Sequence, residues 1–305
     1  MFVDEQLAGA DRVSAVVVRG DVRELVEPGS FPVVVAWVGD RFGGTGPAAA
    51  DVVVGEDDVA AALASIERSP LTAATLAVLL RSIVGVTVDD GLAMESAAYS
   101  VLQAGPEFAA WRAGAPHVAD TSADHAVAVE RRGDELLVTL DRPHRHNAIT
   151  AQLRDELHAA LTVAAADDSV TSVVLRGNGP SFSSGGDLGE FGTRSDPATA
   201  HVTRLARSPS RLIHQLRDRT TARIHGAALG GGIELAAFAG RVVAHPDTVV
   251  ALPEIELGLI PGAGGTVSLT RRIGRRRTAA LALTGRRIDA RTAMTWRLVD
   301  ELERT

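Results

Sequence analysis

Residues 225–235, His-Gly-Ala-Ala-Leu-Gly-Gly-Gly-Ile-Glu-Leu, contain three consecutive glycines and, two residues later, a glutamate. The residues before this glycine-rich segment predict a strand over Thr221–His225. The apolar residues after it predict a helix over Ile233–Phe238. Glycines in a turn from strand to helix leave backbone N–H groups free to face a ligand and allow another group to approach closely. The alternative is a plain tight turn that binds nothing.

A second glycine-containing loop, Ser183–Asp187, follows the predicted strand Val170–Arg176. Two loops of this kind could direct two N–H donors at a single oxygen, which is the arrangement of an oxyanion hole. Either loop alone is explained equally well as a tight turn. Neither loop has the GxGxxG spacing of a dinucleotide-binding turn.

Two glutamates lie close to these turns in the sequence. Glu234 is at the N-terminal end of its predicted helix, where carboxylates commonly interact with the helix dipole. Glu254 follows Pro253 at the end of the predicted strand Val249–Leu252, and an extended segment would point Glu254 and Glu256 to the same side. Carboxylates from separate loops that meet in an apolar pocket suit general acid–base chemistry. The spacing leaves open whether these two carboxylates meet.

The composition removes several kinds of chemistry. The 305 residues include no cysteine, and all 31 basic residues are arginine, so lysine is absent. The chain therefore has no disulfide, no thiolate metal site and no cysteine nucleophile. It also cannot form a lysine Schiff base or a phosphate-loop lysine contact. Carboxylates, hydroxyls, histidine, arginine and backbone N–H groups remain as possible catalysts.

Charge and hydropathy limit the partners that we expect. A net charge of −7 argues against a general polyanion binder, and an aromatic content of 4% argues against base-stacking platforms. No apolar run reaches the roughly 18 residues of a membrane span. The N-terminus, with Asp4 and Glu5, lacks the pattern of a signal peptide. We expect a cytoplasmic protein that binds neither nucleic acid nor membrane.

The charge is divided unevenly along the chain. Residues 1–118 hold 7 arginines and 16 acids, whereas residues 119–305 hold 24 arginines and 22 acids. We predict two modules with these bounds, joined by the small, polar segment 114–124. Strands and helices alternate in the second module, which indicates an α/β fold. Further predicted strands are Ala15–Val18, Pro32–Val38, Asp51–Val54, Ala126–Glu130 and Leu136–Leu140, and further predicted helices are Val59–Ile66, Ala73–Arg81, Val88–Leu102, Ala198–Asp218, Arg277–Leu283 and Asp289–Trp296.

Four segments resemble the enoyl-CoA hydratase/isomerase (crotonase) superfamily, in order and at the family's spacing. They are Asn147–Ile149, Ser181–Leu188, His225–Leu235 and Leu252–Thr266, and the likeness extends over about residues 125–302. The resemblance implies an α/β fold with a spiral of ββα turns as its core, to which this chain adds N-terminal strands and helices. It specifies the reaction less closely than the fold, because one scaffold hosts several chemistries.

The resemblance also implies catalytic roles. A thioester carbonyl would lie between the backbone amides of Gly186 and Gly231, which stabilise enolate charge. Family members that hydrate 2-enoyl-CoA carry both glutamates, here Glu234 and Glu254, to hold and deprotonate water, with Glu254 placed to protonate C2. Isomerases usually keep only the glutamate that matches Glu254. We therefore predict hydration, with isomerisation or a non-catalytic acyl-CoA-binding partner subunit as alternatives, no metal, and no cofactor beyond the coenzyme A of the substrate.

The same resemblance places Arg142–Asn147 along the nucleotide part of coenzyme A, with Arg142 or Arg145 as the phosphate contact. Solvated loop arginines are the alternative. For Asp187 a helix cap is the leading interpretation and a substrate contact the lesser one, and His225 is interpreted as a structural residue at a strand end. The predicted substrate-binding residues are Arg142, Arg145, Asn147, Ser184, Asp187, Leu188 and Gly230.

The first module resembles a displaced part of the family. Family members typically continue beyond the position of Val299 with helices that close the site and help to build a trimer, whereas this sequence stops at Thr305. Segments 66–81, 91–96 and 105–108 resemble those helices. We hypothesise a partial repeat whose helices complete the site, within the chain or in a neighbouring subunit of a homotrimer or dimer of trimers. Residues 66–113 remote from the second module would contradict this hypothesis.

Overall fold

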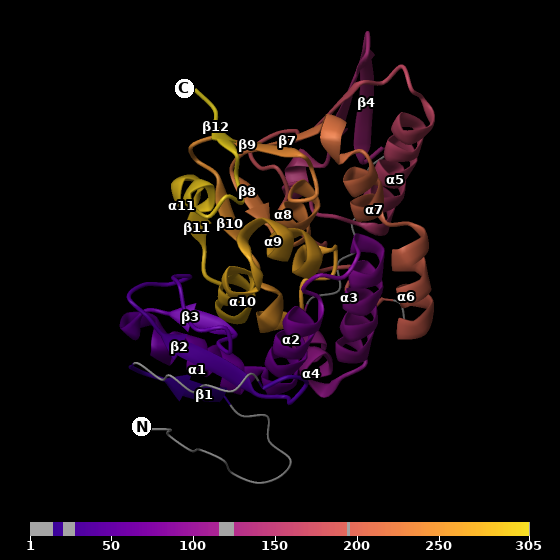
Figure 1. The fold of residues 1–305 in the computed structure, drawn as a ribbon. Helices are drawn as coiled ribbons and strands as arrows, with labels where there is room; N and C mark the ends of the chain where they lie inside the picture. The colour runs from indigo at the N-terminus through magenta and orange to yellow at the C-terminus, as the bar shows by residue number, and fades with distance from the viewer. Residues whose placement is uncertain (1–14, 21–27, 116–124, 194–195, 305) are drawn as a thin grey trace.

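The computed structural model describes residues 15–20, 28–115, 125–193 and 196–304. Figure 1 shows the strands and helices of the first module, in indigo to magenta, against one flank of the later α/β core. Most of the predicted linker, residues 116–124, lies outside the described residues. The division into modules at residue 118 therefore stays a prediction.

The first module begins with short valine-rich strands, which suit β-branched side chains. β1 (Ala15–Val18), β2 (Val34–Val38) and β3 (Val52–Val54) form a parallel sheet in that order, close to the predicted bounds. The helical segments that follow are η1 (Glu56–Asp58), α1 (Val59–Arg68), α2 (Pro70–Ser82), α3 (Val88–Gln103) and α4 (Pro106–Gly114).

Local sequence explains where these helices start. Pro70 occupies the first turn of α2, where its missing N–H leaves no helical bond unmade. The Thr87 hydroxyl accepts a hydrogen bond from the Asp90 amide and caps α3. Among the described residues, no single helix has the length and apolar character to cross a membrane; η1–α1 and α2 meet that test only as a joined pair, bent by 105°.

A six-stranded sheet supports the second module. Its order is β12-β9-β7-β6-β5-β4, in which β4 and β5 form an antiparallel hairpin and the other neighbours pair in parallel. The strands are β4 (Val127–Arg132), β5 (Glu135–Leu140), β6 (Ser172–Gly177), β7 (Thr220–Ile224), β9 (Arg241–Ala244) and β12 (Glu301–Leu302).

A smaller sheet carries the glycine-rich turn. It has the order β11-β10-β8, from β8 (Ala227–Leu229), β10 (Val249–Ala251) and β11 (Ile288–Asp289). The sequence predicts a glycine-rich turn over the residues between the strand Thr221–His225 and the helix Ile233–Phe238, and this prediction was wrong for its first half. Residues of β8 pair in parallel with β10, more than twenty positions later, and local sequence does not reveal such a partner.

The helices of the second module cover these sheets. The predicted single helix Ala198–Asp218 was wrong: the structure has α6 (Pro197–Ala206) and α7 (Pro209–Gln215). Pro209 has no N–H to continue a helix, and the Ser208 hydroxyl accepts from the Arg211 amide to start a new one. The remaining segments are η2 (Pro143–Arg145), α5 (Ala151–Ala166), η3 (Arg217–Arg219), α8 (Gly231–Ala236), η4 (Glu254–Leu257), α9 (Gly265–Ile273), α10 (Arg275–Thr284) and α11 (Ala290–Thr295).

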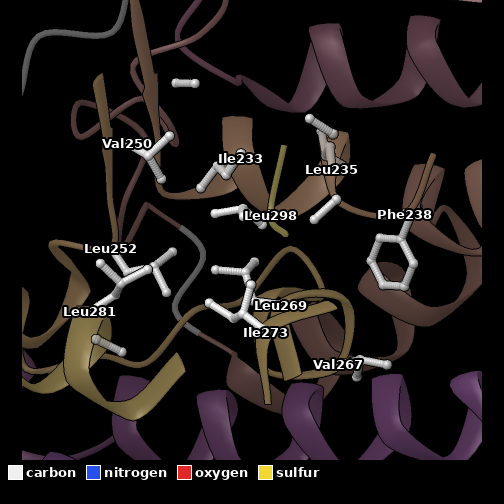
Figure 2. Packing of buried hydrophobic residues seen from close by; sticks show 14 of the residues in the cluster. Ile233, Leu235, Phe238, Val250, Leu252, Val267, Leu269, Ile273, Leu281 and Leu298 are labelled. Atoms are coloured by element: carbon white, nitrogen blue, oxygen red, sulfur yellow. The ribbon is translucent and has the colours of Figure 1, made fainter. Parts of the chain in front are cut away.

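An apolar core fixes the short helix α8. Figure 2 shows Ile233 and Leu235 of α8 in one cluster with Leu269 and Ile273 of α9, and all four side chains are buried. Burying a side chain of this size stabilises the fold by about 1.5–3 kcal/mol. Because α8 is held on both sides of Glu234, the backbone that carries this glutamate has a defined position.

Candidate active site

The two glycine loops meet beside each other, as the oxyanion-hole hypothesis requires. Ser183 and Ala228 form a β-bridge, and a methyl group added to Gly231 would lie 3.9 Å from the amide nitrogen of Gly186. Within the described residues, neither the Gly186 nor the Gly231 amide has a hydrogen-bond acceptor. Both glycines line one cavity of about 680 Å³, which we call the glutamate cavity. Two unpaired N–H donors therefore face a shared space.

The turns that carry these two donors each contain a glycine with a positive φ angle. Gly230 has φ +45° and Gly185 has φ +92°, a region that residues with a Cβ rarely adopt. A methyl group on Gly230 would also lie 2.3 Å from Oε1 of Glu254. Glycine at position 230 thus permits both the turn and the close approach of the glutamate.

Glu234 is almost fully buried in α8 and lines the glutamate cavity. Its Oε2 accepts hydrogen bonds from the amides of Ala263, at 2.7 Å, and Gly265, at 2.8 Å. Burial raises the pKa of this carboxyl well above 4.5, the charges of Glu254 and Glu95 raise it further, and the two amide bonds oppose the shift.

Glu254 begins η4 and faces the same cavity. Its Oε2 is buried and has no hydrogen-bond partner among the described residues. Burial is the largest cause that raises its pKa, to about 8. The expectation that Glu256 points the same way as Glu254 was wrong, because these residues form a 3-10 helix rather than an extended segment, and Glu256 is exposed.

A third buried glutamate, Glu95 of α3, also lines this cavity, and sequence reasoning missed it. Its oxygens accept from the Gly264 amide at 2.6 Å, the Thr266 amide at 2.9 Å and the Thr266 hydroxyl at 2.6 Å. Burial raises its pKa to about 7, and these hydrogen bonds oppose the shift. In the sequence, segment 91–96 stands out only for its likeness to a family helix, and nothing local marks Glu95 as buried.

A second cavity adjoins the first. This loop cavity, of about 860 Å³, shares Gly186, Asp187, Phe191 and Glu254 with the glutamate cavity. The shared residues place the unpaired Gly186 amide and the Glu254 carboxyl where the two spaces meet. An extended ligand could therefore occupy both, with its reacting atoms at the junction. No group of three or more metal-ligating side chains occurs in the part of the chain that the structure describes.

Comparison with known proteins agrees with this geometry. The model of the family described as enoyl-CoA hydratase/isomerase matches residues 133–303. The chain belongs to the enoyl-CoA hydratase/isomerase family. It is similar to the 2,3-dehydroadipyl-CoA hydratase of Escherichia coli (strain K12), with 37% identity over 174 residues, 57% of this chain and 68% of that protein. It is similar to a probable enoyl-CoA hydratase of Rhizobium meliloti (strain 1021), with 38% identity over 54% of this chain and 63% of that protein.

Solved structures of the family share the fold. The enoyl-CoA hydratase from Thermoplasma volcanium GSS1 superposes with a TM-score of 0.53 at 36% identity, over 59% of this chain and 72% of that one. DspI of Pseudomonas aeruginosa gives 0.55 at 29% identity, over 61% and 77%. The predicted α/β crotonase-like fold is thereby confirmed.

The predicted coenzyme A loop divides into two sets of residues. Arg145, Ser184, Leu188 and Gly230 line the loop cavity, and Arg145 and Leu188 are exposed. A substrate contact by these residues stays a prediction.

Arg142 and Asn147 have a different position. Both side chains are buried and line neither cavity. Arg142 Nη1 donates to Asp187 at 3.2 Å and to the Ala148 carbonyl at 2.6 Å. Asn147 donates to the carbonyls of Asn178 and Ser181. Through these contacts Arg142 and Asn147 stabilise the loop from its buried side. Of Arg142 and Arg145, only Arg145 is therefore accessible to a phosphate in the loop cavity.

Two further expectations can be compared with the structure. Asp187 caps no helix, since residues 188–192 form turns; its Oδ1 accepts from the Gly189 amide, and Asp187 also lines both cavities. His225 follows β7, with Nε2 2.9 Å from the Gly179 carbonyl, which agrees with a structural role.

The front helices contact the site within the same chain. The ring of Tyr99 in α3 lies against Gly262, where a methyl group would be 2.4 Å from it. Ser69 donates to the Ile255 carbonyl at 3.0 Å, and Trp111 of α4 meets Phe191 edge-on at 6.2 Å. Residues 66–113 are therefore not remote from the second module. Their origin as a repeat stays a hypothesis.

Proposed function

We propose that this protein is an enoyl-CoA hydratase, which adds water across the 2,3 double bond of a 2-enoyl-CoA thioester. One observation carries the proposal: two buried glutamates and two unpaired backbone amides face a single cavity. Family membership supports it, since the matched relatives include proteins named as enoyl-CoA hydratases. The reaction needs no cofactor beyond the coenzyme A of the substrate.

The amides of Gly186 and Gly231 would receive the thioester oxygen. Attack of water at C3 moves electron density through C2 onto this oxygen, and two fixed N–H donors stabilise the charge as it develops. One such donor is typically worth about 100- to 1000-fold in rate. Because neither amide has an acceptor in the part of the chain that the structure describes, the substrate oxygen would displace no hydrogen bond seen there.

The two glutamates would divide the acid–base work. Two amide bonds to Oε2 favour the ionised form of Glu234, so we assign it as the base that takes a proton from water. The pKa of both carboxyls is raised by burial, and the hydrogen bonds distinguish them: Oε2 of Glu254 has no donor among the described residues, which favours its protonated form, so we assign it to give a proton to C2. Water oxygen bonds to C3 and hydrogen to C2. A proton then passes from Glu234 to Glu254, which restores the starting state.

The coenzyme A portion would lie in the loop cavity. That cavity opens beside Arg145, whose guanidinium is exposed and can meet a phosphate. The acyl tail would extend from the junction into the glutamate cavity, between the core and α3. We propose that a homotrimer or dimer of trimers is the working assembly, as in the family that the sequence resembles.

Hydration of crotonyl-CoA tests the proposal directly. Purified protein should remove the conjugated thioester absorbance and produce the 3-hydroxyacyl thioester. Glu234→Gln and Glu254→Gln should each lower kcat by about 100- to 10,000-fold, since each removes a proton-transfer group. Glu67→Gln, at an exposed glutamate of α1 that lines neither cavity, is the control and should keep most of the rate.

The results of these assays distinguish the hydratase, the isomerase and the non-catalytic binder from one another. If short and long enoyl thioesters are not hydrated although coenzyme A thioesters bind, the protein is a non-catalytic binder and the proposal fails. If a 3-enoyl thioester is converted to its 2-enoyl isomer and Glu234→Gln keeps the full rate, the isomerase alternative replaces hydration.

A further inference from the structure

The glutamate cavity continues past the glutamates to a wall that carries positive charge. Arg204 of α6 lines this wall together with Ser96, Tyr99 and Gln103 of α3. The same cavity is lined by Gly231 and Glu234, so the oxyanion amides and the arginine face one continuous space. The proposed hydration step uses Glu234, Glu254 and the two backbone amides, and it does not involve Arg204.

Arg204 is held in place by groups that carry no charge. Its Nε donates to the Ser96 hydroxyl at 3.0 Å, and Nη2 donates to the Ser96 carbonyl at 3.3 Å and to the Ser100 hydroxyl. Its guanidinium carbon lies 4.7 Å from the centre of the Tyr99 ring, a cation–π contact. These contacts orient the guanidinium without a hydrogen bond to a carboxylate, and among the carboxylates of the described residues only the charge of Glu95, on the same cavity, acts on it at longer range.

No carboxylate pairs with Arg204 in the described ranges, and its Nη1 has no acceptor there. The other arginines of the cavity differ in this respect. Arg154 and Arg207 both bond Asp155, at 2.7 and 2.5 Å. A partly buried guanidinium normally has a carboxylate partner, because removal of an unpaired charge from water is costly. An anion from outside the chain would satisfy this arginine.

A second polar group on the same wall also lacks a partner. Oε1 of Gln103 is buried without a hydrogen-bond partner among the described residues. This oxygen is an acceptor, so it would pair with a donor such as water and not with a carboxylate, and the case for an anion on this wall rests on Arg204. Arg204 lies on α6 of the second module and Gln103 on α3 of the first. Both modules therefore contribute polar groups to this wall of the cavity.

We propose that Arg204 is a specificity-determining residue that binds a carboxylate at the far end of the acyl chain. The substrate class would then be ω-carboxylated 2-enoyl-CoA thioesters rather than purely aliphatic ones. This inference rests on the proposed function, since it places the acyl tail in the glutamate cavity. The guanidinium would donate Nη1–H to the carboxylate, as arginine commonly does in carboxylate recognition.

The glutamates of the cavity are compatible with an anionic tail. Burial raises the pKa of Glu254 to about 8 and that of Glu95 to about 7, so near neutral pH much of the negative charge expected of three carboxylates is absent. A substrate carboxylate would therefore meet the positive field of Arg204 with reduced repulsion from its surroundings.

Binding of two saturated thioesters of equal chain length tests the inference without catalysis. We would measure calorimetric Kd values for hexanoyl-CoA and for its ω-carboxylated analogue with wild-type protein, Arg204→Met and Arg207→Met. The wild type should bind the ω-carboxylated thioester about 10- to 100-fold more tightly, the worth of one or two charge-assisted hydrogen bonds. Arg204→Met should lose this preference and keep its affinity for hexanoyl-CoA. Arg207→Met, an equal loss of charge at an exposed arginine of the same cavity, should retain the preference.

Equal wild-type affinities would overturn the inference, and this comparison does not depend on whether a variant folds. A lower melting temperature of Arg204→Met with an unchanged preference would also overturn it, because Arg204 would then only join α6 to α3. The crotonyl-CoA assay keeps the two proposals apart. Turnover without the ω-carboxylate preference refutes this inference alone, whereas the preference without any hydration refutes the proposed reaction alone.

Discussion

Glu95, Glu234 and Glu254 come from three different elements, yet all three carboxyls face one cavity. Their surroundings differ at the level of single hydrogen bonds. Glu234 and Glu95 accept from backbone amides, whereas Oε2 of Glu254 has no partner among the residues that the structure describes. Differences of this kind separate an acid from a base among chemically identical side chains. Glu234 and Glu254 interact strongly, so their apparent pKa values belong to the pair and not to either residue alone.

The pH dependence of the rate should reveal this division. Catalysis needs one ionised and one protonated glutamate, so kcat should follow a bell-shaped profile. Its alkaline limb should lie near pH 8, where Glu254 loses the proton that C2 requires. Its acid limb should lie above the usual range of a glutamate, because the pKa of Glu234 is also raised. Steady-state hydration of crotonyl-CoA between about pH 5 and pH 10 would measure both limbs. A rate that stays constant from neutral pH to pH 10 would contradict the assignment of Glu254 as the acid.

At the scale of the element, the N-terminus of α9 links the catalytic glutamate to the front helices. Four consecutive amides alternate between two carboxyls: Ala263 and Gly265 donate to Glu234, and Gly264 and Thr266 donate to Glu95. The N-terminal end of a helix favours negative charge, and here two acids share it. Glu95 is therefore a positioning residue: it holds the turn whose other amides orient Glu234.

Glu95→Gln should disturb this turn. The new NH2 group would face a backbone N–H in place of an acceptor, so we expect a loss of about 1–3 kcal/mol in the free energy of unfolding and a fall in kcat of about 10- to 100-fold. Glu67→Gln, at an exposed glutamate of the first module, is the control and should change neither quantity appreciably. Urea unfolding and crotonyl-CoA kinetics would measure both. Full activity in Glu95→Gln would remove the positioning role.

The stability of the protein should also depend on pH through Glu95. Its folded pKa of about 7 lies above the unfolded value of 4.5, so between these values the folded state keeps a proton that the unfolded state has lost. Its contribution to stability is therefore greatest below about pH 4.5 and declines as pH rises toward 7. The urea-unfolding free energy of Glu95→Gln should fall less steeply over this interval than that of the wild type. Parallel pH curves for the two proteins would show that Glu95 does not titrate in this range.

At the scale of the whole molecule, a buried carboxyl joins the first module to the second. Asp51 precedes β3 and is 2% exposed. It accepts from the Val35 amide and from Arg81 of α2, both at 2.8 Å, and from Arg275 of α10 at 3.3 Å. Arg275 also donates to the Ala50 carbonyl. These bonds connect the front sheet to a core helix, and the front helices in turn hold the turn at α9.

Asp51→Ala should therefore destabilise the protein strongly. It leaves two largely buried arginines without their carboxylate, for which we expect a loss of about 3–5 kcal/mol in the free energy of unfolding. Asp57→Asn removes one acidic charge at an exposed position of the same module and should change stability by less than about 0.5 kcal/mol. Equilibrium urea unfolding would compare the two variants. Similar stabilities would show that the Asp51 contacts contribute little to the union of the modules.

Much of this architecture could be predicted because it is encoded locally. Alternating strand and helix signals predicted most elements to within a few residues, and the glycines at 185 and 230 marked turns whose positive φ angles disfavour a Cβ. The predicted single helix over 198–218 and the shared direction of Glu254 and Glu256 failed for local reasons, a proline at 209 and a 3-10 turn. The helix break was readable in the sequence, because a proline inside a helix costs about 3 kcal/mol or more, whereas nothing local distinguishes the 3-10 turn from an extended segment.

The sequence by itself determined the chemical inventory: carboxylates, arginines and unhindered backbone amides, with neither cysteine nor lysine. It also determined the local turns that present Gly186 and Gly231. Only the tertiary structure decided that Glu95 lies beside Glu234, that Arg142 braces a loop, and that Arg204 faces the cavity without a carboxylate. The physical reason is that burial and pairing depend on residues far apart in the chain, here up to 171 positions for Glu95 and Thr266. A local pattern assigns a residue to a face of its own element but does not specify which other element will cover that face.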